Sequence, residues 1–156
     1  MLRLIPFALA LALAACGATS ERPAVSEWQA NATGAAQQLR GDAGEVAGLD
    51  RISAARAALH DESRLFVLLV AFGDLGGCRH MRAALGRRPP GFASADGLFG
   101  RACAHAAQAA SLFTRAVARD DPAALVDAAR EARTAIPFFE RAELALPSRR
   151  RRLRGS

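Results

Sequence analysis

The fold of this chain is constrained most by the spacing of its apolar residues. They recur every three or four positions, and no segment alternates with the two-residue period of a strand. Trp28, Ala32, Ala35 and Leu39 follow the helical spacing, and similar stripes recur as far as residue 139. Alanine, the best helix former, supplies nearly half of the apolar residues. The sequence therefore predicts an all-α fold with a thin core, a single small antiparallel bundle of four or five helices.

Glycine, proline and short polar runs indicate where the predicted helices begin and end. Gly41 is expected to end the first helix as a left-handed cap. Asp121 and Pro122 are expected to start the last helix, as its N-cap and its first-turn proline. The run of residues 65–72 is apolar on all sides, which predicts the central and most buried helix of the domain.

The amino terminus has the layout of a bacterial export signal. Arg3 precedes an apolar run that extends from residue 4 to residue 15, which is too short to span a bilayer as a helix. The run ends in Leu13-Ala14-Ala15-Cys16, a branched apolar residue, two small residues and a cysteine. This sequence resembles the lipobox of bacterial membrane lipoproteins.

The resemblance implies that a peptidase removes residues 1–15 and that Cys16 carries acyl chains such as palmitate, which anchor the protein to a membrane. Two or three chains on one residue give stable anchoring. Residues 16–23 are then the lipidated cysteine and a flexible tether, residues 24–146 the helical domain, and residues 147–156 a disordered arginine-rich tail. Gly17 follows the cysteine in place of aspartate. In a Gram-negative host this implies an outer-membrane protein that faces the periplasm.

The charge of the chain is concentrated outside the predicted domain. The formal net charge is +6, and all 21 basic residues are arginine. Arg3 and five tail residues account for six of them, and the remaining 15 equal the 15 acidic residues. A neutral domain does not favour nucleic-acid binding. The tail is a candidate for attraction to anionic lipid, although it is also explained as a solvated chain end; its arginines are Arg149, Arg150, Arg151, Arg152 and Arg154.

Cys78 and Cys103 are the two cysteines that remain if Cys16 is lipidated. They lie at similar distances on either side of the proline-containing segment 86–95, so they face each other in an antiparallel hairpin. In an oxidising compartment this arrangement predicts a disulfide that joins the two helices. Each cysteine is also followed two positions later by a histidine, at His80 and His105, so a metal site is the alternative. Residues two apart on a helix point about 200° away from each other, which disfavours that site.

No motif of a catalytic or cofactor-binding site is present in the sequence. We therefore expect no enzyme activity, no cofactor and no metal. The expected function is that of a lipid-anchored domain of the cell envelope that binds another envelope component. Phe92, Phe99 and Arg87-Arg88, on or near the long loop, are candidates for the binding face. The alternative is a periplasmic lipoprotein that binds a small ligand or a metal through the Cys-x-His hairpin.

Overall fold

A computed structural model describes residues 25–146, which form five α-helices and no strand. The helices are α1 (Val25–Val46), α2 (Ile52–Leu59), α3 (Glu62–Ala84), α4 (Ala93–Arg119) and α5 (Pro122–Ala145). The predicted all-α class and the predicted number of helices are confirmed. Within these residues, none of the helices combines the length and the hydropathy that crossing a membrane requires.

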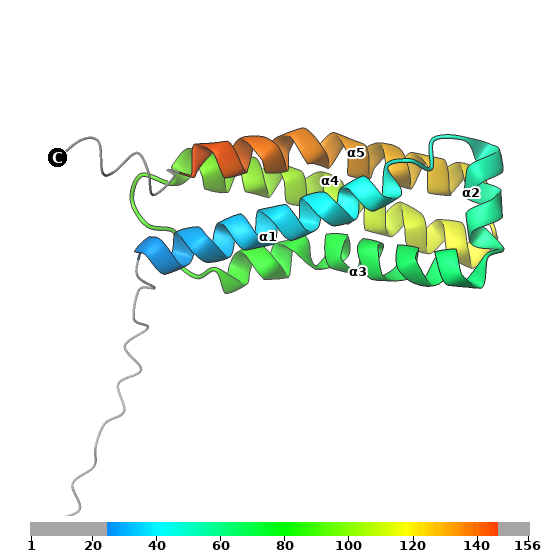
Figure 1. Cartoon of the computed structure of the whole chain (residues 1–156), viewed down its shortest axis with the longest axis horizontal. Coiled ribbons are helices and arrows are strands. Elements are labelled where there is room, and N and C mark those ends of the chain that lie inside the picture. Colours follow the sequence, from blue (N-terminus) through cyan, green and yellow to red (C-terminus); the bar gives the residue numbers. More distant parts are fainter. Residues whose placement is uncertain (1–24, 147–156) are drawn as a thin grey trace, which may run out of the picture.

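The four long helices lie lengthwise in the bundle, and the short α2 crosses one end of it (Figure 1). α1 packs against α3 and α5, and α4 packs against the same two helices. Neighbouring long helices run in opposite directions (Figure 1). This arrangement is an antiparallel four-helix bundle in which α2 serves as a crossover between α1 and α3.

The two ends of the bundle are made of different parts of the chain (Figure 1). At one end α1 begins, α5 ends and residues 85–92 connect α3 to α4; we call this the terminal end. At the other end lie α2 and the short turn between α4 and α5; we call this the crossover end. The 23-residue α3 runs between them over about 35 Å, at 1.5 Å per residue.

Alanine fills much of the core, most clearly where α4 and α5 pack against each other. These two helices share the most extensive contact in the bundle. Small side chains let the helix backbones approach closely, but each one buries little area. Several alanines of α5 have no exposed surface at all: Ala128, Ala129, Ala132 and Ala135. The thin core predicted from the composition is therefore present.

Aspartates cap the two long helices that begin at the crossover end, α3 and α5. The Asp61 carboxylate accepts a hydrogen bond from the backbone N–H of Arg64 at the start of α3. Asp121 accepts from the backbone N–H groups of Ala123 and Ala124 at the start of α5. These bonds satisfy donors that the first turn of a helix leaves unpaired. The predicted start of the last helix at Asp121 and Pro122 is confirmed.

The predicted end of the first helix at Gly41 is wrong, because α1 continues through Gly41 to Val46. Leu39, Ala43 and Val46, on either side of the glycine, have no exposed surface. A glycine inside a helix costs only about 1 kcal/mol relative to alanine. Burial of this continuous stripe outweighs that cost, so tertiary packing sets the end of the helix.

The prediction that residues 65–72 lie in the most buried helix is also wrong. Phe66, Leu69 and Val70 of α3 are exposed to solvent. The reason is geometric: α3 contacts α1 and α4 on its inner side, and no long helix covers its outer side. Because α3 is apolar on all sides over this run but is covered only on its inner side, its outer side remains an exposed apolar surface.

Candidate functional site

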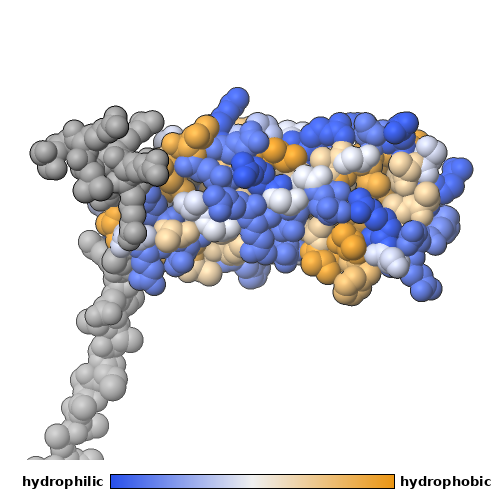
Figure 2. Space-filling model, in the orientation of Figure 1, coloured by the Kyte–Doolittle hydropathy of each residue, from blue (hydrophilic) through white to orange (hydrophobic). Residues whose placement is uncertain are grey.

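An uncovered apolar strip lies along the outer side of α3. Phe66, Leu69 and Val70 are 68%, 50% and 52% exposed, although each is a large apolar residue. Gly73 and Gly77 continue the strip toward the terminal end. We call these five residues the α3 face. Figure 2 shows apolar surface over α3 at the lower edge of the molecule.

The helical period explains why these residues share one side. From Phe66 the steps to Val70, Gly73 and Gly77 are four, three and four residues, which keeps them on one stripe of a helix. A methyl group added at Gly73 or Gly77 would meet no atom within 4 Å beyond the neighbouring residues and the local backbone of α3 itself. The α3 face is therefore bulky near the crossover end and flat along its middle, where a second backbone has room to approach.

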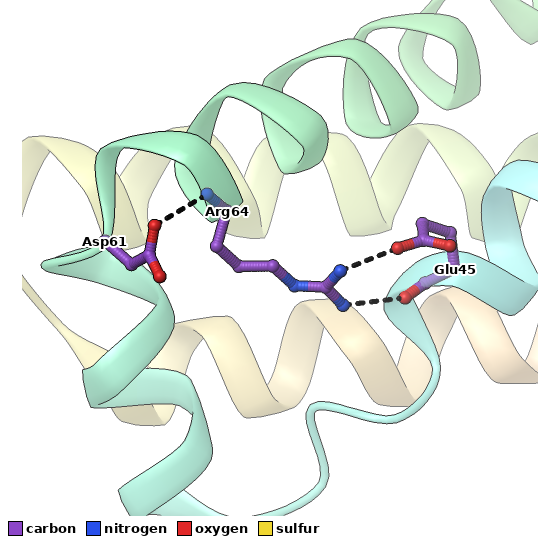
Figure 3. A network of polar contacts seen from close by, with 3 residues as sticks. All are labelled: Glu45, Asp61 and Arg64. Carbon is purple, nitrogen blue, oxygen red and sulfur yellow. Dashed lines mark hydrogen bonds and ion pairs between the residues drawn. The ribbon is translucent and has the colours of Figure 1, made fainter.

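Polar contacts fix the first turn of α3, just before Phe66 (Figure 3). The Arg64 guanidinium donates to the Glu45 carboxylate at 2.7 Å and to the Glu45 main-chain carbonyl at 3.3 Å. Asp61 caps the same turn through the Arg64 backbone N–H at 3.0 Å. Arg64 thus links the end of α1 to the start of α3 across the α2 crossover.

A disulfide joins α3 to α4 toward the terminal end. Cys78 and Cys103 are bonded to each other, with their Cα atoms 5.3 Å apart, and both are buried. The predicted disulfide is confirmed. The bond closes a segment with a sequence separation of 25 that contains the whole α3–α4 connection. It fixes the spacing of the two helices next to that connection.

Beside the disulfide, a bidentate ion pair links the same two helices. Arg82 Nε and Nη2 each donate to the Asp96 carboxylate at 2.8 Å. These hydrogen bonds hold the pKa of Asp96 below its ordinary value. Partial burial of the carboxylate opposes this shift by raising the pKa, and the charges of Arg82 and Arg88 lower it further. A Cβ at Gly100 would lie 3.0 Å from Arg82 Nη1. Because glycine has no side chain, the Arg82 guanidinium can lie directly against α4 at this position.

This ion pair forms part of a hollow of about 390 Å³ in the surface of the terminal half of the bundle. The hollow is lined by three arginines and one carboxylate, so its formal charge is positive. We call it the arginine hollow, and its lining residues are Arg79, Arg82, Ala83, Gly86, Arg88, Asp96, Gly100 and Cys103. Gly86 has a φ of +74°, which glycine adopts without strain as the chain leaves α3.

The histidines of the Cys-x-His pairs are not brought to a common site with the cysteines. His105 Nδ1 lies 2.8 Å from Glu131 Oε2, and its ring stacks on Phe138. His80 is exposed on α3. Each cysteine sulfur is bonded to the other, so neither is a thiolate ligand in this structure. Within residues 25–146, no three metal-ligating side chains are arranged to hold an ion.

Two carboxylates meet where α1 passes α3. Desolvation by burial, and secondarily the charge of Asp74, raise the pKa of Asp42 from 3.8 to about 6. Gln38 donates to Asp74 at 3.0 Å, whereas Asp42 Oδ2 is buried without a hydrogen-bond partner among the described residues. The ionised form of Asp42 is therefore disfavoured in the fold.

Of the residues predicted to form a binding face, some are buried and others are exposed. Phe92 and Phe99 are each 4% exposed, so the prediction that they bind a partner is wrong. Phe92 packs against Trp28, with ring centroids 5.2 Å apart, and both belong to the core. Arg87 and Arg88 are exposed as expected, and Arg88 lines the arginine hollow. Cys16 and the tail arginines lie outside the described residues, and those residues are Arg149, Arg150, Arg151, Arg152 and Arg154.

Sequence reasoning missed the α3 face, although its signal was present in the chain. A helix that packs on one side needs a stripe of apolar residues, not a full circumference of them. The run of residues 65–72 has more apolar residues than one packed side of a helix can bury, and the additional ones indicate an exposed apolar surface. The arginine hollow had no comparable signal, because it depends on the fold bringing residues 79–88 beside residues 96–103.

No protein-family model, curated protein or solved structure matches this chain. Two surface features remain from which a function can be inferred, the α3 face and the arginine hollow.

Proposed function

We propose that this protein is a lipid-anchored adaptor of the bacterial cell envelope, which binds an envelope protein through its α3 face. Residues 1–15 act as the signal peptide, and Cys16 carries the lipid. The helical domain has no catalytic role. In a Gram-negative host the protein is held on the outer membrane and faces the periplasm.

The observation that carries this proposal is the exposure of Phe66, Leu69 and Val70 on one side of α3. Contiguous apolar surface on a small domain disfavours the isolated state, because water contacts side chains that a partner would cover. Single exposed apolar residues are common, but here three large ones adjoin on a single helix. The two glycines beyond them leave room for a partner helix to lie along α3.

The position of the α3 face fits an anchor at Cys16. Eight residues separate Cys16 from the start of α1 at Val25, so the tether spans at most about 27 Å. α1 begins at the terminal end, which the tether therefore keeps near the membrane (Figure 1). Phe66 lies 18 residues before Ala84 at the terminal end of α3, which is about 27 Å along the helix. The bulky part of the α3 face thus lies far from the end at which the tether is joined.

The disulfide supports the proposed compartment. Disulfides persist in oxidising environments such as the periplasm and are rare in the cytosol. The Cys78–Cys103 bond spans the connection between α3 and α4 and therefore suits a domain exported across the inner membrane.

Site-specific photo-cross-linking in living cells tests the proposal. A photoreactive residue at position 69 replaces Leu69 on the α3 face, and a control places it at Arg115, an exposed residue of α4. We expect a discrete cross-linked protein from position 69 and none from position 115. The same product is expected to disappear when Phe66→Ser and Val70→Ser are introduced together, because they remove the apolar contact without disturbing buried residues.

The outcomes separate the occupants of the face. A second copy of this chain in the product would make the partner the protein itself and overturn the adaptor role. Equal labelling from both positions, or a product that survives the double substitution, would mean that the α3 face is not the binding surface.

A further inference from the structure

The arginine hollow concentrates positive charge in one depression of the domain surface. Arg82 is paired with Asp96, but Arg79 and Arg88 have no carboxylate within ion-pair distance among the described residues. Three arginines and one carboxylate leave a formal charge of +2 around one depression.

We propose that the arginine hollow binds a phosphate group, either as the free ion or as the head group of an anionic lipid. Guanidinium groups bind phosphate through paired N–H donors and keep their charge at every physiological pH. Two unpaired guanidinium groups beside a fixed third one match a doubly charged anion. The volume of about 390 Å³ exceeds that of a water molecule more than tenfold and admits a phosphate with its substituent.

The side chains and helices that line the hollow are held in position by neighbouring contacts. Asp96 uses two N–H groups of Arg82 and leaves the two N–H groups of Nη1 free to donate. Gly100 leaves the space in which that guanidinium lies. The disulfide between Cys78 and Cys103 fixes α3 against α4 immediately beside the hollow. A ligand therefore meets Arg82 already oriented, and only Arg79 and Arg88 must be ordered on binding.

The location connects the site with the proposed anchor, and this step rests on the proposed function. The hollow lies in the terminal half of the bundle, from which the tether to Cys16 leaves. Five tail arginines follow α5 from the same end. An anionic head group is then within reach of the hollow, and its binding would orient the bundle on the membrane.

Isothermal titration of the mature protein, purified in an uncharged detergent, tests the site. The probes are inorganic phosphate, dihexanoyl phosphatidic acid and, as the neutral control, dihexanoyl phosphatidylcholine. The double variant Arg79→Ala/Arg88→Ala removes the unpaired charges of the hollow. The matched control, Arg115→Ala/Arg119→Ala, removes the same charge from exposed residues of α4 near the crossover end.

We expect inorganic phosphate and the phosphatidic acid to bind the wild type, to bind at least tenfold more weakly to the hollow variant, and to bind the control variant unchanged, whereas the phosphatidylcholine, which has no net charge, should not bind. Tighter binding of phosphatidic acid than of phosphate identifies a lipid head group as the source, and equal binding identifies the free ion. Equal losses in both variants, or no loss in the hollow variant, would overturn the site. Loss of the lipid on Cys16 leaves the titration with inorganic phosphate intact, so failure of the anchor and failure of the site are distinguishable.

Discussion

The two ends of the bundle differ in the contacts that hold α3, although each half of the bundle also contains a buried aromatic pair, Phe99–Phe139 toward the terminal end and Phe72–Phe113 toward the crossover end. Toward the terminal end, Phe99 is buried edge-on against Phe139, with ring centroids 5.8 Å apart, and the disulfide joins α3 to α4. At the crossover end, the first turn of α3 depends on the contacts of Arg64 with Asp61 and Glu45, which are exposed (Figure 3). Burial of an aromatic ring stabilises a fold by several kcal/mol, whereas an exposed ion pair contributes less than about 1 kcal/mol.

The two ends also differ in how their large apolar side chains are used. Phe66 and Phe99 are both phenylalanine, but Phe66 lies outside the core and therefore contributes little to the stability of the fold. The apolar surface of the crossover end is therefore available to a partner without loss of the fold. The terminal end combines its aromatic core with the arginine hollow, with the start of α1 and with the end of α5.

The largest effect is expected from the aromatic core of the terminal end. Phe99→Ala removes a side chain that is 4% exposed and leaves a cavity against Phe139. We expect the free energy of unfolding to fall by about 3–5 kcal/mol, measured by urea denaturation. A loss below about 1 kcal/mol would mean that the terminal end is not held by this core.

The disulfide is expected to have the next largest effect. The double variant Cys78→Ala/Cys103→Ala frees a segment with a sequence separation of 25. Because the bond restricts the unfolded chain, its removal should cost about 3 kcal/mol in urea denaturation. Reduction of the wild type with dithiothreitol is the control and should lower stability by a similar amount. Indifference to both changes would contradict a structural role for the bond.

At the crossover end, loss of a helix cap is expected to be milder. Asp61→Ala removes the acceptor for the Arg64 backbone N–H at the start of α3. We expect a loss of about 1 kcal/mol, the usual contribution of an N-cap. Asp61→Asn is the matched control, since asparagine also caps helices, and it should retain most of the stability. Equal losses in the two variants would show that the charge, not the cap, is what matters.

Asp42 gives a pH-dependent effect of smaller size. Its pKa in the fold is about 6, above the ordinary 3.8, so the folded state holds its proton more tightly than the unfolded state. The group thus stabilises the fold fully below pH 3.8, and this stabilisation is lost as the pH rises through 6. Asp42→Asn should raise the free energy of unfolding by about 0.5 kcal/mol at pH 8, a value discounted because the residue as a whole is only partly buried. The gain should vanish at pH 3.5, and a gain of equal size there would contradict the raised pKa.

The smallest change in stability is expected on the α3 face. Phe66→Ser replaces a side chain that is 68% exposed, so the free energy of unfolding should change by less than about 0.5 kcal/mol. Set beside Phe99→Ala, this variant sharpens the contrast between the two ends. A loss above 2 kcal/mol would show that Phe66 belongs to the core and would remove the basis of the proposed docking surface.

The parts of the fold that depend on local pattern could be predicted from the sequence. Helical spacing gives the all-α class, and Asp121 with Pro122 marks the start of α5. The similar distances of Cys78 and Cys103 from the connecting loop indicate that they face each other, because the two helices are antiparallel.

The parts that depend on which surfaces meet could not be predicted. Gly41 lies inside α1 because Leu39 and Ala43 are buried by other helices. Phe99 is buried because Phe139, 40 residues later, packs against it, and nothing near Phe99 in the chain reveals this. The arginine hollow likewise requires Arg82 to meet Asp96 across two helices.

The measurement that tests the central proposal most directly is the mass of the native protein extracted from membranes without reduction, after free thiols have been blocked. The account predicts a chain that begins at Cys16 and carries acyl chains on that residue, with Cys78 and Cys103 linked to each other and unblocked. An unmodified precursor, or a soluble product with two blocked thiols, would contradict the anchor and the exported compartment together.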